Sequence, residues 1–154
     1  MDLPEPGLYR TTAPHPRQSD AFPAGRLVFV GQKDDQGFVV VPHYNENNRW
    51  FWREPTTPLG DADGEFVAGL VALPPEGIYT LPRTLTFEGG GRWLDNAVVQ
   101  LGYDRQGQGI AFVAERRPVD ANGLFFSDRG QRIDDAVLFG LRWAPILPVQ
   151  DDAH

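Results

Sequence analysis

One phrase occurs twice in this chain, and the repeat constrains the fold more than any other sequence feature. LPEPGLYR runs from Leu3 to Arg10, and LPPEGIYT runs from Leu73 to Thr80. Four further blocks of similar residues follow each phrase in the same order. The paired blocks are LVFVG at 27–31 with VVQLG at 98–102, GFVVV at 37–41 with GIAFV at 109–113, NRWFW at 48–52 with NGLFF at 122–126, and FVAGL at 66–70 with VLFGL at 137–141. Because the paired blocks keep the same order and lie a nearly constant number of residues apart, they indicate an internal duplication.

The duplication predicts two units, residues 1–76 and residues 77–154, the second ending in a short acidic tail. Each unit opens with a Gly-Leu/Ile-Tyr strand, and a β-branched strand ending in glycine follows. A turn at 33–36 or 104–108 then leads into a second apolar strand and an aromatic strand. Asp63 or Asp134 is expected to cap a single helical turn before a last strand at 70–73 or 141–144. In the second unit the cap could instead begin a two-turn helix.

Five short strands with one helical turn before the last strand resemble the plan of an SH3-like barrel. The opening Leu-Tyr strand and Phe22-Pro23-Ala24-Gly25, which leads into the strand at 26–30, add to this resemblance. The resemblance implies an all-β protein of two tandem SH3-like five-stranded barrels. Peptide-binding members have an acidic segment after the first strand, whereas Thr11–Gln18 is not acidic, and Trp50 and Trp52 lie later than the paired tryptophans of that family. Binding of proline-rich peptides therefore does not carry over.

Composition supports a globular β protein and limits its chemistry. The chain is 41% hydrophobic and 12% aromatic, and 17 glycines and 14 prolines separate short apolar runs. This pattern favours many turns and short strands. There is no cysteine, so disulfides and thiolate metal sites are excluded.

Charge and location signals point to a bacterial cytoplasmic protein and disfavour nucleic acid as its partner. The first residues include acidic residues and prolines, where a signal peptide would have basic residues and an apolar core. No apolar run is long enough to span a membrane. One lysine against thirteen arginines indicates a GC-rich bacterial genome. A net charge of −7 repels phosphate backbones and disfavours nucleic acid as a partner.

No residue pattern indicates catalysis, a metal or a cofactor, so we expect none of the three. His43 is the one histidine beside a predicted strand, and neither Ser19 nor Ser127 has the context of a nucleophile. The segment 61–65 (DADGE) lacks the spacing of a calcium loop, and a turn before a helix explains it better. The Gly-rich pieces at 88–92 and 107–109 lead into strands and are typical of turns.

Comparison of the two copies separates fold residues from candidate site residues in the segment RWFWR at 49–53. Strand side chains alternate between faces, so Trp50 and Trp52 share one face. Their counterparts, Leu124 and Phe126, are also large and apolar, which predicts that the tryptophans belong to the core. Whether they lie in the core or on the surface is left for the structure.

The other face of the same strand differs between the copies. Arg49 and Arg53 correspond to Gly123 and Ser127, while Phe51 is kept as Phe125. Arginines beside an aromatic ring suit an anionic or planar partner, although a solvated strand face with surface ion pairs would have the same residues. The predicted partner-binding residues are Arg49, Phe51, Arg53, Tyr44 and His43.

The leading hypothesis is therefore a non-catalytic module that binds another protein. A narrower form is an acidic inhibitor or immunity-type protein that neutralises a basic toxin. One alternative is a small enzyme with a site in a cleft between the repeats, which would need His43 beside a carboxylate. Another is a nucleic-acid-binding tandem SH3-like module, which would need basic residues gathered on one face: Arg83, Arg92, Arg116 and Arg117.

Overall fold

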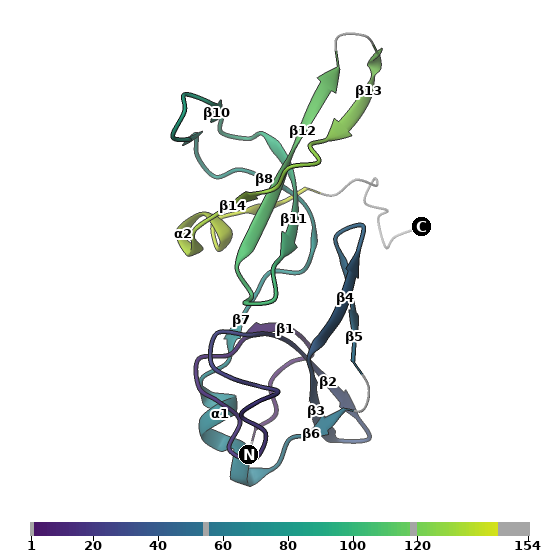
Figure 1. Cartoon of the computed structure of the whole chain (residues 1–154), viewed down its shortest axis with the longest axis vertical. Coiled ribbons are helices and arrows are strands. Elements are labelled where there is room, and N and C mark those ends of the chain that lie inside the picture. Colours follow the sequence, from purple (N-terminus) through teal and green to yellow (C-terminus); the bar gives the residue numbers. More distant parts are fainter. Residues whose placement is uncertain (1, 54–55, 118–119, 145–154) are drawn as a thin grey trace, which may run out of the picture. The chain divides into compact units, whose positions relative to one another are not determined.

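The computed structural model describes residues 2–53, 56–117 and 120–144 and is built mainly from antiparallel strands. The chain divides into two compact units. The first contains the residues up to Pro75 together with Tyr103–Gln108, and the second contains Glu76–Gly102 and the residues from Gly109 onward. The prediction of an all-β protein is confirmed at this level (Figure 1).

The first unit contains one five-stranded sheet and one separate hairpin. In spatial order the sheet consists of β6 (Thr57–Pro58), β3 (Gln36–Val40), β2 (Leu27–Lys33), β1 (Gly7–Arg10) and β7 (Val71–Ala72). The hairpin pairs β4 (Pro42–Glu46) with β5 (Arg49–Trp52). A 3₁₀ turn, η1 (Asp61–Asp63), and a short helix, α1 (Gly64–Ala68), precede β7.

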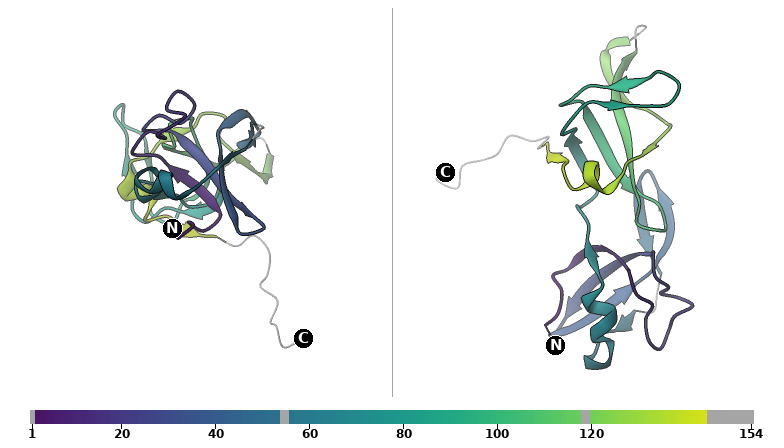
Figure 2. Two further views of the ribbon diagram at one scale, coloured as in Figure 1. Left: turned by 90° about the horizontal axis from the view of Figure 1, so that it is seen from below. Right: turned by 90° about the vertical axis from the view of Figure 1, so that its left-hand side faces the viewer.

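The second unit is described by a similar set of elements. Its sheet has the order β13 (Asp120–Phe126), β12 (Gly109–Arg117), β11 (Val98–Tyr103), β8 (Gly77–Thr80) and β15 (Arg142–Trp143), and β14 (Gln131–Arg132) also pairs with β12. Helix α2 (Asp135–Leu138) precedes β15. A second hairpin, β9 (Leu85–Thr86) with β10 (Arg92–Trp93), projects from this unit in the right-hand view of Figure 2.

Both sheets follow one connectivity, and both are open. The path β6-β3-β2-β1-β7 of the first unit has the same order of connections as the path β14-β12-β11-β8-β15 of the second. Among the described residues the strand pairings form no closed ring, so the closed five-stranded barrels expected from the sequence are not found. The strands at the two ends of each path are only two residues long. They therefore offer little backbone for pairing with each other, which is what would close the sheet into a barrel.

Two turns with positive φ explain the tight hairpins of the first unit. Asp34 and Asp35 have φ of 51° and 65° and join β2 to β3, so the predicted turn at 33–36 is confirmed. Asn47 and Asn48, with φ of 53° and 63°, join β4 to β5. Asp and Asn tolerate this left-handed conformation better than most residues, and turns of this type match the twist of the flanking strands.

The opening phrase that occurs twice has the same structural role in each unit. Gly7 and Gly77 have φ of 156° and 154°, a conformation that side chains rarely adopt, and a Cβ on Gly77 would approach the Trp143 ring at 3.0 Å. The tyrosines two residues further on, Tyr9 and Tyr79, are buried, and each lies in a strand that pairs on both sides: β1 with β2 and β7, and β8 with β11 and β15. Both tyrosines therefore serve the fold.

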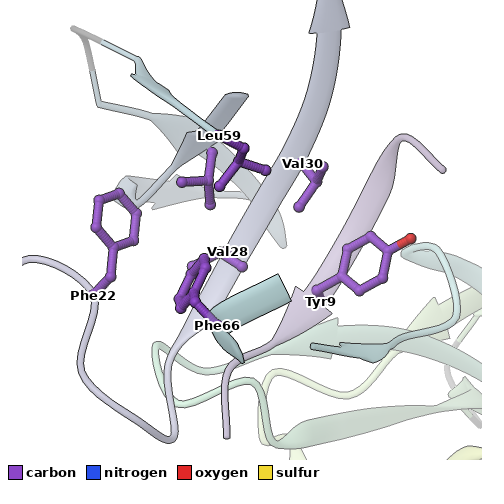
Figure 3. Close-up of a cluster of buried hydrophobic side chains, with 7 residues drawn as sticks. Tyr9, Phe22, Val28, Val30, Leu59 and Phe66 are labelled. Carbon is purple, nitrogen blue, oxygen red and sulfur yellow. The ribbon is translucent and has the colours of Figure 1, made fainter. Parts of the chain in front are cut away.

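The core of the first unit lies between the sheet, the helical segment and the segment that follows β1. Figure 3 shows the buried cluster, which consists of Tyr9, Phe22, Val28, Val30, Val39, Leu59 and Phe66. The segment after β1 is tied to the start of β2 by Thr11, whose hydroxyl donates to the Pro23 oxygen and accepts from the Arg26 amide. This connection holds Phe22 against the sheet.

The two predicted helix caps differ in the structure. Asp134 caps α2, because its Oδ1 accepts a hydrogen bond from the Val137 amide at 2.9 Å, and α2 is a single turn. Asp63 precedes α1, but its side chain makes no cap to that helix. Its carboxylate accepts instead from the amide of Gly60, the residue just before η1, and from Arg17, so Asp63 supports the 3₁₀ turn and does not cap α1. No helix in the described ranges is long and apolar enough to cross a membrane.

The burial of Phe66 predicts a large stability loss on truncation. Phe66 is 1% exposed, so Phe66→Ala should lower the free energy of unfolding by about 3–5 kcal/mol. Phe139→Ala is the control, since Phe139 directly follows the short helix α2 of the second unit and is 49% exposed, whereas Phe66 lies within α1; we expect it to cost less than about 0.5 kcal/mol. Urea unfolding of both variants measures the difference, and equal losses would contradict this core.

Candidate partner-binding surface

The β4–β5 hairpin has an irregular register that directs two neighbouring side chains toward one face. Pro42 pairs with Trp52 and Tyr44 pairs with Phe51, so His43 is an extra residue, a β-bulge. A bulge interrupts the alternation of faces and can re-aim a side chain. It therefore allows His43 and Tyr44 to contact each other although they are adjacent in a strand.

Four predicted site residues form one continuous row on this hairpin. The rings of His43 and Tyr44 meet edge to face at 5.3 Å, and Tyr44 stacks on Phe51 at 4.7 Å with an interplanar angle of 9°. The guanidinium carbon of Arg49 lies 5.7 Å from the centre of the Phe51 ring. We call His43, Tyr44, Phe51 and Arg49 the aromatic row. Tyr44 is 47% exposed, so part of its ring is open to a partner.

The opposite face of the hairpin attaches it to the rest of the first unit. Trp50 is buried, and its Nε1 donates to the Tyr103 oxygen at 2.9 Å. Trp52 is half-buried and contacts the Phe29 ring of β2 at 5.6 Å. Trp50 is therefore a core residue and Trp52 a partly covered one, as the alternation of the strand predicts.

Arg105 supports the base of the hairpin. This residue belongs to the segment 103–108, which groups with the first unit. Its guanidinium donates to the Pro42 and His43 oxygens at 3.1 and 2.9 Å and lies 5.1 Å from the centre of the Trp50 ring. A guanidinium can stack on a ring and donate at its edge at the same time. These contacts fix the bulge that forms the aromatic row.

Arg53 lies apart from the aromatic row. Its amide continues the hairpin by donating to the Val41 oxygen at 2.9 Å. Its side chain is exposed and lines a separate hollow of about 220 Å³ with Gln18, Phe22 and the segment 56–58. The structure thus groups four of the five predicted residues and places the fifth at a different hollow of the same unit.

Sequence reasoning missed a buried ionic cluster beside the helical turn. His15 and Asp63 are fully buried side chains, and Arg17 donates to both oxygens of Asp63 at 3.0 and 3.1 Å. The imidazole packs against Phe66 and Phe22 at 5.1 and 5.8 Å. The prolines on both sides of His15 suggest an exposed loop. The one signal that could have located His15 is weak. It is the aspartate at the start of the predicted helical turn, Asp63.

The hydrogen bond that His15 Nδ1 accepts defines the tautomer of the ring. Nδ1 accepts from the Arg17 amide at 3.2 Å, which leaves the proton of the neutral ring on Nε2. Nε2 lies 3.4 Å from Asp63 Oδ1 but is not aligned for a hydrogen bond. Burial lowers the pKa of His15 below its ordinary value; Asp63 opposes this shift, and Arg17 adds to it. The cluster therefore holds a neutral histidine and acts in packing.

The structure also bears on the calcium-like segment and on metal sites in general. The 61–65 segment forms the 3₁₀ turn and the start of α1. No group of three metal-ligating side chains occurs in the part of the chain that the structure describes. Some expectations concern side chains outside the described residues. They are Leu124, the counterpart of Trp50, and Arg116 and Arg117 of the basic face that nucleic-acid binding would need. Comparison of the chain with protein-family models, curated proteins and solved structures found no match.

The lowered pKa of His15 predicts a loss of stability in mild acid. The unfolded chain takes up a proton as the pH falls below about 6.5, whereas the folded chain does not until a lower pH. The contribution of His15 is thus fully present above pH 6.5 and decreases as the pH falls toward the folded-state pKa. His15→Gln should make the free energy of unfolding depend less on pH between 7.5 and 5.5.

His43→Gln is the control for this measurement, because His43 is exposed. Its unfolding free energy should follow the pH dependence of the unmodified chain. NMR titration of the His15 ring provides an independent reading, in which its pKa should lie below the ordinary histidine value of about 6.5. A pKa of His15 at or above that value would refute the neutral buried state.

Proposed function

We propose that this chain is a non-catalytic protein-binding module whose partner docks on the aromatic row of the β4–β5 hairpin. The observation that carries the proposal is the stack of Tyr44 on Phe51, with Arg49 beside it, on the exposed face of a hairpin whose other face is anchored by Trp50. Tyrosine and arginine are enriched at the centres of protein interfaces.

The row is arranged before any partner binds, which favours affinity. Tyr44 and Phe51 restrict each other through stacking, and the bulge at His43 is held by Arg105. Association loses less side-chain entropy when the contacting groups are already ordered.

The chemistry of the row indicates what a partner presents there. An aromatic or flat aliphatic group would extend the stack over Tyr44, and a carboxylate would meet the guanidinium of Arg49 at the end of the row. The chain as a whole carries a net charge of −7, which accelerates encounter with a basic partner. These features favour the narrower form, an inhibitor or immunity-type protein against a basic toxin, in a bacterial cytoplasm.

We further propose that the two units are SH3-like modules derived from one duplicated ancestor. The shared order of connections, the paired glycines at Gly7 and Gly77 and the buried tyrosines that follow them support this proposal. In this account the hairpin of the first unit is where one copy acquired a binding surface. The counterpart of Arg49 in the second copy is Gly123.

A double substitution tests the docking surface. The intact chain, immobilised, is used to capture partners from the source cell, and the captured protein is identified, purified and measured by calorimetry. Tyr44→Ala with Arg49→Ala should weaken binding by about 30-fold or more, because each central residue of an interface contributes about 1–2 kcal/mol or more.

Arg92→Ala is the matched control, since Arg92 is an exposed arginine on the β10 hairpin of the second unit. It should leave the affinity within about twofold. Circular dichroism confirms that each variant is folded. Equal affinity for the double variant and the control would remove the aromatic row as the docking surface.

A further inference from the structure

A polar cavity of about 330 Å³ lies within the second unit, beside the start of α2. Its walls come from the segment after β8 and from the segment that connects β14 to α2. The polar side chains that line it are Arg83, Thr84, Thr86, Gln131, Arg132 and Asp134. Leu85, Phe87, Ile133 and Val137 form its apolar part, and of these Ile133 and Val137 are buried.

The equivalent place in the first unit is filled. There the segment after β1 brings His15, Phe22 and Arg17 onto Phe66 and Asp63. In the second unit the segment after β8 forms the β9–β10 hairpin instead, and the smaller Val137 stands at the position of Phe66 in the repeat. The second unit therefore keeps an opening that the first unit closes with side chains.

The aspartate that precedes the short helix, Asp63 in the first unit and Asp134 in the second, shows this difference most clearly. Asp63 has a side-chain exposure of 0%, whereas Asp134 is 68% exposed and lies 3.9 Å from Arg83, which is 60% exposed. An exposed pair at this distance contributes little to stability. The guanidinium of Arg83 is thus available to a ligand without the loss of a buried ion pair.

We propose that this cavity binds a small organic carboxylate with an apolar body. Arg83, at the rim of the cavity, provides donors that match the two oxygens of a carboxylate. Threonine hydroxyls on the same wall accept or donate further hydrogen bonds. Leu85 and Phe87, which line the cavity and are partly exposed, offer the apolar contact for the rest of the ligand. The volume is at the lower end of the range for small-molecule sites, so the ligand is about the size of an arylalkanoic acid.

The test is an NMR titration of the full chain with 3-phenylpropionate. Amide signals of residues 83–87 and 131–137 should shift with a dissociation constant in the millimolar range or below. The neutral analogue 3-phenylpropanamide should bind at least about tenfold more weakly, because it cannot accept charge-assisted hydrogen bonds from Arg83. Arg83→Gln should weaken binding of the carboxylate by a similar factor and leave binding of the amide unchanged.

Three results would overturn the proposal. They are the absence of shifts in these two segments up to saturating ligand, equal affinity for the acid and the amide, and inorganic phosphate binding as tightly as 3-phenylpropionate. Arg92→Gln is the matched control within the same unit, because Arg92 is exposed and does not line the cavity. It should bind the carboxylate as the unmodified chain does. A dispersed amide spectrum shows that each variant is folded.

Discussion

The first unit depends on the pairing of one buried carboxylate. Asp63 has no exposed side-chain area, and an unpaired charge at such a position would be strongly destabilising. Two hydrogen bonds from Arg17 and one from the Gly60 amide satisfy it, and the neutral His15 packs beside it. Because Arg17 and His15 both belong to the segment after β1, this pairing also determines where that segment crosses the helical turn. Phe22, at the end of the same segment, then completes the core.

The two units share an order of connections and differ in the segments attached to it. In the first unit the segment after the opening strand is packed into the core, and the β4–β5 hairpin carries the aromatic row. In the second unit the same segment is a hairpin that leaves a cavity beside Asp134. A common framework with divergent attachments is the usual way in which one fold acquires different binding functions. The proposed protein partner and the proposed carboxylate therefore belong to different units and can be tested separately.

Much of the fold could be predicted from periodicity and turn residues, because strands a few residues long between Asp, Asn and Gly turns leave few alternatives. The burial of Trp50 followed from the comparison of the segment at 49–53 with its counterpart at 123–127. The aromatic row was predicted in part, since alternation placed Arg49 and Phe51 on one face, but the bulge that adds His43 depends on a register that the sequence does not reveal. The ionic cluster could not be predicted, because the contact between Arg17 and Asp63 spans 46 residues and no local pattern signals it. The closed barrels were expected from the SH3-like resemblance, which does not determine how long the terminal strands are.

The central claim is that the exposed face of the β4–β5 hairpin is where a protein partner docks. The most direct measurement is cross-saturation NMR on the isotope-labelled chain bound to its purified, unlabelled partner. The account predicts that saturation transfers most strongly to the amides of residues 43–51 and much less to those around Arg92 and Trp143. Transfer centred on the second unit, with none at the hairpin, would contradict it.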